Sequence, residues 1–219
     1  MIHKLVIFGV GELAQLAHYY FSSDSDYDVA AFTVDAEYVK NSSFCGLPVV
    51  AFEDVAMHYP YQEYDFFVAT GYAKLNALRK EKYLAAKSLG YRLASYVSSR
   101  AYVQGQRGDN CFIFENATIQ PFATIGDNVI IWSGAFIGHH TLIKSHTFIA
   151  PLAAISGDVE IGEQCFIGLN ATVRDHIKVG DKCVVGAGAI LLGDAEPEGV
   201  YRGPATRRSK SPSMQLRRI

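Results

Sequence analysis

From residue 113 onward, an aliphatic side chain recurs at every sixth position. The series runs without a gap from Ile113 to Leu191 and has fourteen members. Two positions before each member lies a second column of small or medium-sized residues, which begins with Cys111, Ala117 and Ala123. A period of six is neither the 3.6 of a helix nor the 2 of a strand. It is typical of a hexapeptide β-helix, in which three repeats form a triangular coil and residues eighteen apart stack. The fourteen repeats predict between four and five coils.

The aliphatic column predicts the interior of each coil, and the small column fits beside it at the corners. Glycine follows the aliphatic residue at six positions, where we expect it to permit a backbone bend that a side chain would oppose; these are Gly126, Gly138, Gly162, Gly168, Gly180 and Gly186. Three of the four cysteines, Cys111, Cys165 and Cys183, belong to the small column. We therefore interpret them as packing residues rather than nucleophiles.

The first hundred residues follow a different pattern, in which strand and helix signals alternate. Apolar runs predict strands over residues 4–8, 29–34 and 65–70, and helices are expected over residues 13–21 and 73–89, the second capped by Gly90. This alternation favours a small parallel α/β sheet. The sequence thus predicts two domains: an α/β domain over residues 1–100 and an all-β domain over residues 101–219, which includes a C-terminal tail.

Composition narrows the class of protein. The 219 residues carry a net charge of −2, which disfavours a general nucleic-acid binder. No apolar run is long enough for a spanning helix, and the start of the chain has no signal-peptide pattern. Four cysteines are too few for a disulfide framework in a chain of this size. We expect a cytoplasmic globular protein.

The chain resembles the hexapeptide-repeat sugar acyltransferases typified by the NeuD and PglD proteins. The resemblance is carried by the Val6–Gly11 turn, by Ile137-Gly138-His139, and by residues 161–170 and 199–205. It implies a Rossmann-like nucleotide-sugar-binding domain followed by a left-handed β-helix. It also implies a homotrimer that transfers an acetyl group from acetyl-CoA to an amine or hydroxyl of a sugar. In the family the acceptor is often a nucleotide-linked 4-amino sugar for a surface glycan such as the lipopolysaccharide O-antigen. No metal is implied.

Acyl transfer from a thioester needs a base for the nucleophile and a donor for the developing oxyanion. The resemblance assigns the base to His139, and Gly157, one coil later, is expected to leave open space beside the imidazole and to supply an oxyanion N–H. His140 is a departure, because many relatives carry Glu or Asp there. Stacking predicts a ladder of His140, Asp158 and His176, which either supports the histidine pair or is a solvated polar face. The catalytic candidates are therefore His139, His140 and Asp158.

The resemblance also supplies a CoA groove between neighbouring β-helices, at positions matched here by Phe148, Gly157, Leu169 and Ala187. Phe148 replaces a polar residue of one well-known member of the family. Basic residues of the tail, from Arg202 to Arg218, are either solvated or paired with CoA phosphates. His146 has no role in the family, and we interpret it as a packing residue.

A Gly-x-Gly turn at residues 9–11 follows the first predicted strand and opens a helix, so its N–H groups can face a phosphate. Asp35 ends the second strand, where an acid can bind sugar hydroxyls. The resemblance places a nucleotide-sugar site at Gly11, Glu12, Leu13, Asp35, Gly71 and Tyr72. Lys74 and Arg79, near Gly71, either contact a diphosphate or are ordinary residues of a helix surface.

The leading hypothesis is an acetyl-CoA-dependent sugar N-acetyltransferase, with O-acetylation in the same family as the nearest alternative. A second class is a metal-dependent hydratase, because four of the seven histidines lie in the β-helix and related coils bind zinc between subunits. A third is a non-catalytic scaffold whose N-terminal domain binds a ligand. Metal content distinguishes the hydratase, and CoA binding distinguishes the scaffold.

Overall fold

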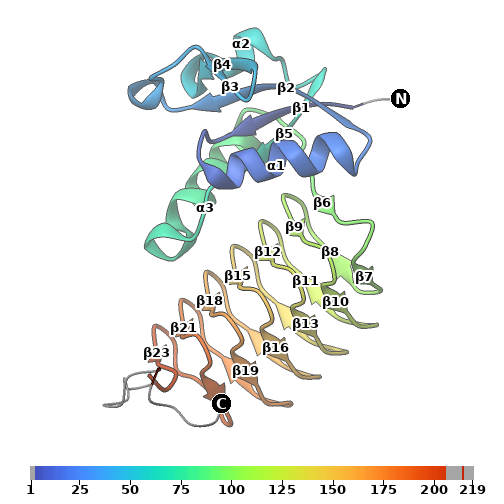
Figure 1. The fold of residues 1–219 in the computed structure, drawn as a ribbon, viewed down its shortest axis with the longest axis vertical. Coiled ribbons are helices and arrows are strands. Elements are labelled where there is room, and N and C mark those ends of the chain that lie inside the picture. Colours follow the sequence, from blue (N-terminus) through green and yellow to red (C-terminus); the bar gives the residue numbers. More distant parts are fainter. Residues whose placement is uncertain (1–2, 206–213, 215–219) are drawn as a thin grey trace.

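The structure, a computed structural model, describes residues 3–205 and residue 214. An N-terminal α/β region lies against one side of a stack of triangular coils (Figure 1). The sheet of the first region has the strand order β3-β4-β2-β1-β5. All pairs in this sheet are parallel except β3 with β4. Its strands are β1 (His3–Phe8), β2 (Tyr27–Val34), β3 (Ser43–Phe44), β4 (Leu47–Ala51) and β5 (Tyr64–Val68).

Three α-helices and two 3-10 turns complete this region: α1 (Glu12–Ser23), η1 (Ala36–Tyr38), η2 (Phe52–Asp54), α2 (Val55–His58) and α3 (Ala73–Ser88). α1 buries one side chain of each of its turns between the sheet and the coils, whereas α2 and α3 pack on the other sheet face. The three predicted strands and the helix at residues 13–21 are confirmed within a few residues. The short elements between β2 and β5 were not predicted, because none is long enough to show a period.

The beginning of α3 differs from the prediction of a regular helix over residues 73–89. Lys74, Leu75 and Asn76 have φ values of 50°, 51° and 61°, so the right-handed helix starts only after them. The predicted cap is confirmed: Gly90 follows the helix with a φ of 93°, in the region that favours glycine. The left-handed segment lets the chain turn from the end of β5 onto the coils.

The coils form a left-handed parallel β-helix with three faces. Strands eighteen residues apart pair in register, as Ile131 does with Ile149. The docking face consists of β6 (Tyr96–Val97), β9 (Phe112–Ile113), β12 (Ile130–Ile131), β15 (Phe148–Ile149), β18 (Phe166–Ile167), β21 (Val184–Val185) and β23 (Val200–Tyr201). The apolar face consists of β7 (Tyr102–Val103), β10 (Thr118–Ile119), β13 (Phe136–Ile137), β16 (Ala154–Ile155), β19 (Thr172–Val173) and β22 (Ile190–Leu191). The polar face consists of β8 (Gln106–Arg107), β11 (Thr124–Ile125), β14 (Leu142–Ile143), β17 (Glu160–Ile161) and β20 (Lys178–Val179).

Three corners join these faces. The first joins the docking face to the apolar face, the second joins the apolar face to the polar face, and the third leads back to the docking face. Every member of both sequence columns is buried in one core that runs the length of the coils. The six-residue period is therefore confirmed as the pattern of a β-helix interior. The cysteines of the small column are buried, as predicted, and the Cys165 thiol donates to the carbonyl of Gly180 at 3.1 Å.

The glycines that follow the aliphatic column are there for a different reason from the one predicted. None of the six has a positive φ. A Cβ on Gly138 would instead lie 2.4 Å from the backbone nitrogen of Gly157, so the glycine is required by the close approach of the next coil. The left-handed residue at the corners is usually not glycine; His140 and Lys182, for example, have φ values of 59° and 57°.

The two regions share a buried interface along the docking face and the third corner. The outward side chains of β9, β12 and β15 are buried beneath α1 and the loop before α3. At the third corner the amide of Asn110 accepts a hydrogen bond from the Val68 N–H and donates to Asn128, each at 2.8 Å. Asn128 continues this polar ladder to Nδ1 of His146 at 2.9 Å. The interface therefore fixes the carboxyl end of β5 relative to the coils.

Candidate functional site

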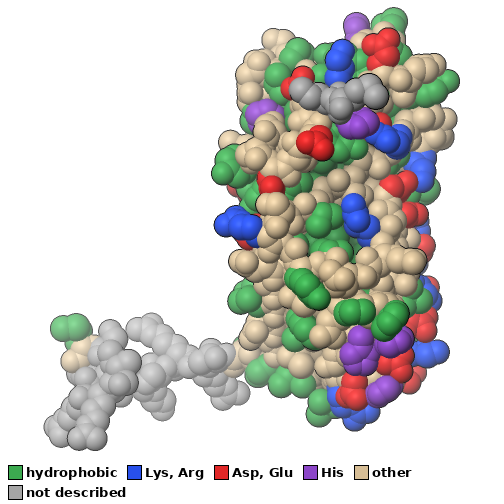
Figure 2. All heavy atoms as spheres, turned by 90° about the vertical axis from the view of Figure 1, so that its right-hand side faces the viewer, with side chains coloured by type: hydrophobic (Ala, Val, Ile, Leu, Met, Phe, Trp, Pro, Cys, Tyr) green, Lys and Arg blue, Asp and Glu red, His purple; other side chains and the backbone are tan. Residues whose placement is uncertain are grey.

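The second corner carries the cluster of histidines. Phe122, His140, Asp158 and His176 stack there at intervals of eighteen residues, all with left-handed backbone, beside a second column of His139, Gly157 and Asp175. Figure 2 shows histidine side chains grouped with acidic ones on this side of the β-helix, next to hydrophobic side chains. The coil therefore brings together the three residues that sequence reasoning selected for catalysis.

His139 is held through both its ring and its backbone. Its Nδ1 lies 3.1 Å from Nδ1 of His140, and its backbone N–H donates to Oε1 of Gln120 at 2.9 Å. A Cβ on Gly157 would lie 2.6 Å from Cε1 of the ring. The imidazole therefore fills the space beside Gly157. The prediction that this space is open is wrong. Within the described residues Nε2 has no hydrogen-bond partner, so this nitrogen is the one free to take a proton.

The ladder below His140 is formed only in part. His140 stacks on Phe122, with ring centroids 4.8 Å apart and planes at 30°. Asp158 does not bond to His140 but accepts from Nδ1 of His176 at 2.8 Å. A hollow of about 370 Å³ on the polar face is lined by His140, Asp158 and His176 together with Glu160 and Lys178. The carboxylate of Asp158 therefore belongs to the pair with His176 and reaches His139 only through neighbours.

The backbone at Gly157 offers a free donor. Its carbonyl accepts from the His176 N–H at 3.3 Å, whereas its own N–H has no acceptor among the residues that the structure describes. This N–H lies on the same corner as His139. An unpaired backbone donor beside a histidine with a free nitrogen is the combination that attack on a thioester carbonyl requires.

The four predicted CoA positions do not converge within one chain. Gly157 lies at the second corner, whereas Leu169 and Ala187 lie on the first corner and are exposed. Phe148 lies on the docking face, where its ring contacts Tyr72 and Phe166 at centroid distances of 5.0 and 5.4 Å. The Phe148 side chain is buried by the N-terminal region, which removes it from any groove along the corners.

The predicted nucleotide-sugar residues do share one edge. Gly11 precedes α1, Asp35 follows β2 and Gly71 follows β5, so all three lie at the carboxyl ends of parallel strands, where ligands bind in open α/β sheets. Gly9 has a φ of 123°, and a Cβ there would lie 2.8 Å from the carbonyl oxygen of Ala69. Only glycine therefore lets the turn after β1 approach the end of β5 so closely. Glu12 and Leu13 form the first turn of α1 beside it.

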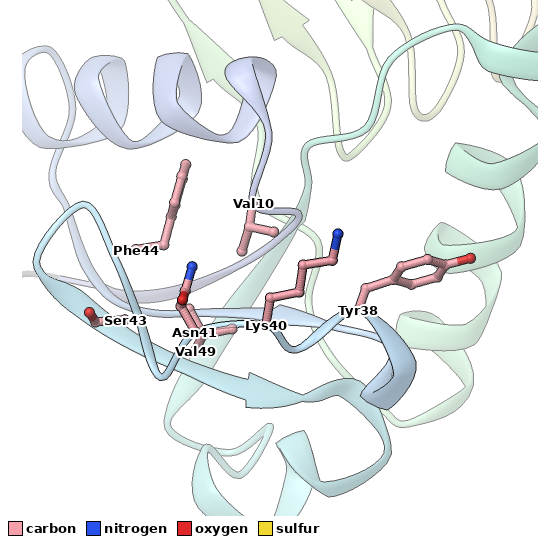
Figure 3. Close-up of a pocket in the computed structure, with 7 residues that line it drawn as sticks. All are labelled: Val10, Tyr38, Lys40, Asn41, Ser43, Phe44 and Val49. Carbon is pink, nitrogen blue, oxygen red and sulfur yellow. The ribbon is translucent and has the colours of Figure 1, made fainter.

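A pocket of about 410 Å³ adjoins this edge and was missed by sequence reasoning. It lies between the turn at Val10 and the β3–β4 hairpin, and it is lined by Val10, Tyr38, Lys40, Asn41, Ser43, Phe44 and Val49. Figure 3 shows Lys40 and Phe44 extending from the hairpin segment toward the Val10 turn. The only sequence signal was the cluster of polar and aromatic residues after Asp35, which has no period.

Two cations near this edge, Arg79 and Lys82, are partly or fully buried and make contacts within the chain. Arg79 does not face a diphosphate: it is fully buried, and Nη2 donates to the carbonyls of Thr147 and His146 at 3.2 and 3.4 Å. Burial lowers the pKa of Arg79 to about 9. Lys82, which was not predicted, pairs with Asp35 at 2.6 Å and lies over the rings of Phe8 and Phe52. Tyr72 is half exposed above Phe166, and Lys74 lies in the left-handed segment.

The remaining candidates from sequence are placed as follows. His146 is buried against Tyr83, as predicted for a packing residue. Burial raises the pKa of Cys111 and of Cys165 to about 12, which opposes a nucleophilic role. The basic tail residues after Arg202 lie outside the described residues. In the described part of the chain, no three His, Cys, Asp or Glu side chains cluster closely enough to hold a metal, and no helix is suited to cross a membrane.

Comparisons with known proteins agree with the hexapeptide fold. Residues 108–139 match the model of the bacterial transferase hexapeptide (six repeats), and residues 158–192 match that of the hexapeptide repeat of succinyl-transferase. A search of curated proteins gives no match.

Among solved structures, the acetyltransferase domain of PglB from Neisseria gonorrhoeae is 26% identical, with a TM-score of 0.81 over 92% of this chain and 97% of that one. PerB from Caulobacter crescentus, solved with CoA and GDP-perosamine, is 26% identical, with a TM-score of 0.82 over 93% of this chain and 95% of that one. WeeI from Acinetobacter baumannii is 17% identical and shares the fold, with a TM-score of 0.61 over 86% of this chain and 95% of that one.

The fold and these matches support a hexapeptide-repeat acyltransferase of the NeuD/PglD-like kind. Within that class, this chain is similar to the acetyltransferase domain of PglB and to PerB.

Proposed function

We propose that the chain transfers the acetyl group of acetyl-CoA to an amine, at C4, of a nucleotide-linked amino-deoxy sugar used in surface-glycan biosynthesis. The observation that carries the proposal is that the His139 ring, with its unpartnered Nε2, packs against Gly157, whose backbone N–H has no acceptor among the described residues. Support for the substrates comes from relatives: PglB was solved with acetyl coenzyme A, and PerB with CoA and GDP-perosamine.

In this proposal Nε2 of His139 removes a proton from the sugar amine as its nitrogen attacks the thioester carbon. A C–N bond forms, and the negative charge that develops on the carbonyl oxygen is met by the Gly157 N–H. The C–S bond then breaks, and the proton held by His139 goes to the departing thiolate of CoA. All electrons and protons are accounted for without a covalent enzyme intermediate.

Residues 1–100 would bind the nucleotide end of the acceptor. The N–H groups at the Gly11 turn and the positive end of α1 suit a diphosphate. Asp35, oriented by Lys82, suits the ribose hydroxyls. The neighbouring pocket, with Phe44 and Asn41 in its lining, has the flat apolar and amide groups that suit a nucleobase. Gly71 and Tyr72 would then contact the sugar, between the nucleotide site and the coils.

The distribution of predicted CoA residues favours a homotrimer. Leu169 and Ala187 lie on the first corner and Gly157 on the second, at opposite edges of the apolar face. The outward side chains of that face include Tyr102, Phe136 and Ile190, with exposed fractions of 57, 37 and 66%, and none of its outward residues from β7 to β22 is charged. A first corner packed beside the second corner of another copy would unite these positions in one groove, under the cyclic symmetry usual for such assemblies.

The test is a thiol-release assay with acetyl-CoA and UDP-, dTDP- and GDP-linked sugars, each offered as the 4-amino and the 4-hydroxy form. We expect release with a 4-amino sugar and loss of release in His139→Ala, which should still bind CoA. His176→Ala, two coils away in the neighbouring column, serves as the matched control. Release with only 4-hydroxy sugars would replace the proposal with O-acetylation. Absence of CoA binding would replace it with a scaffold role.

A further inference from the structure

The two adjacent histidines share one proton. Nδ1 of His139 and Nδ1 of His140 are 3.1 Å apart, which is hydrogen-bond distance. Two lone pairs at this distance repel each other, and two N–H groups clash, so one nitrogen donates and the other accepts. The direction of this single bond decides which nitrogen of His139 carries its proton.

We propose that His140 accepts this hydrogen bond and thereby fixes His139 as the tautomer with the proton on Nδ1. The inference rests on the proposed function, in which Nε2 of His139 must present a lone pair to the acceptor amine. His140 is then a positioning residue that acts through His139. Where many relatives carry Glu or Asp, His140 supplies a neutral acceptor for the hydrogen bond from Nδ1 of His139.

The surroundings of His140 hold its ring with Nδ1 toward His139. Its backbone is left-handed, with a φ of 59°, and its ring is stacked on Phe122. The charged and titratable groups around it are His139, Asp158, His176, Glu160 and Lys178. The nearest carboxylate, that of Asp158, is already bonded to His176, and both Glu160 oxygens face lysines. No carboxylate in the described residues is bonded to His140, so His139 is the one hydrogen-bond partner of its side chain there.

Protonation of His140 would reverse the bond. A cationic His140 carries protons on both nitrogens and can only donate. His139 would then accept at Nδ1, carry its proton on Nε2 and lose the lone pair that takes the proton of the amine.

Two residues that already occupy the equivalent left-handed corner position elsewhere in the chain provide matched variants. Gln164 has a φ of 55° and Lys182 a φ of 57°, so His140→Gln and His140→Lys are both compatible with the backbone. Glutamine can accept the bond, whereas a lysine ammonium can only donate. Histidine-selective ¹⁵N NMR of the free protein at pH 8 reads the tautomer of His139 directly, without CoA or sugar. His176→Gln is the control in the same column.

We expect the Nδ1–H tautomer of His139 in the wild type, in His140→Gln and in His176→Gln, and the Nε2–H tautomer in His140→Lys. Turnover should fall roughly 100-fold or more in His140→Lys, as for loss of a general base, and less than about 10-fold in His140→Gln. An Nε2–H tautomer in the wild type, or the same tautomer in wild type and His140→Lys, overturns the inference. If the tautomers are as expected but no sugar is acetylated, the proposed function fails and the assignment of the bond stands.

Discussion

The imidazole of His139 occupies the position that a side chain on Gly157 would need. A Cβ on Gly157 would lie 2.6, 2.8 and 3.0 Å from Cε1, Nε2 and Nδ1 of the ring. Gly157 has no positive φ, so its lack of a side chain is required by the neighbouring ring and not by its own backbone. The base and the donor of the proposed oxyanion site are therefore positioned by one contact.

Gly157→Ala is expected to displace the His139 ring and to lower turnover by about 100-fold or more, because a general base must be within hydrogen-bond reach of its proton. The melting temperature should change little, since alanine is compatible with this backbone. Gly193→Ala is the matched control: Gly193 lies in the same column two coils later, and a Cβ there meets nothing within 4 Å. Full turnover in Gly157→Ala would remove His139 from the base role.

The buried His146 makes stability depend on pH. Burial lowers the pKa of His146 from 6.5 to about 4, so between these values the unfolded chain binds the proton and the folded chain does not. Stability contributed by neutral His146 is therefore complete above pH 6.5 and falls as the pH drops toward 4, by at most about 1.4 kcal/mol per pH unit.

His146→Asn tests this dependence, because asparagine occupies the preceding rung of the ladder at Asn128 with the same left-handed backbone. Urea unfolding at pH 7 and at pH 5 should show a smaller loss of unfolding free energy in the variant than in the wild type. Equal losses in the two proteins would mean that His146 takes up its proton without penalty in the fold.

The pocket beside the Gly11 turn predicts a residue that binds the nucleotide. Asn41→Ala is expected to weaken binding of the preferred nucleoside diphosphate by about 5- to 10-fold, the effect of one lost hydrogen bond, and to leave CoA binding unchanged. Calorimetry with the free nucleotide measures this. Gln62→Ala is the control, since Gln62 lines a different hollow, of about 550 Å³, at the amino end of β1 and β5. Equal weakening in both variants would argue against the pocket.

The apolar face predicts the effect of charge on assembly. Ile190→Lys combined with Phe136→Lys places two ammonium groups on a face whose outward residues are uncharged. We expect the proposed homotrimer to dissociate to monomers, as measured by light scattering. Thr124→Lys puts the same charge on an exposed position of the polar face and should leave the assembly intact. An unchanged trimer in the double variant would place the interface elsewhere.

The interior of the β-helix was predictable because each coil repeats one rule, and a period of six over fourteen repeats leaves a single phase. What the outward residues contact was not predictable, since that depends on which face the N-terminal region covers. Phe148 and Arg79 illustrate the difference. Both carry side chains that suit a ligand, and both are buried by contacts between segments about seventy residues apart.

Within the site, the spacing of eighteen residues per coil correctly predicted that His140, Asp158 and His176 lie at one corner. It could not decide how hydrogen bonds divide among them, because Asp158 lies between two histidines and its carboxylate bonds only to His176. The glycines were predicted at the right places for the wrong reason. A sequence shows that a side chain is missing, and only the packed coils show whether a bend or a neighbour requires its absence.

The left-handed corner residue gives the β-helix an unusual tolerance. Different residue types occupy this position with φ values between 55° and 59°: Asn128, His140, Asp158, Gln164 and Lys182. Because that position is outside the interior columns, its identity at the second corner is not set by packing inside the coil. Reactive side chains can be exchanged at that corner, or placed one coil further along the axis, without a change of the interior residues. In a β-helix of this kind, new chemistry can therefore evolve by substitution at one corner position while the interior residues stay the same.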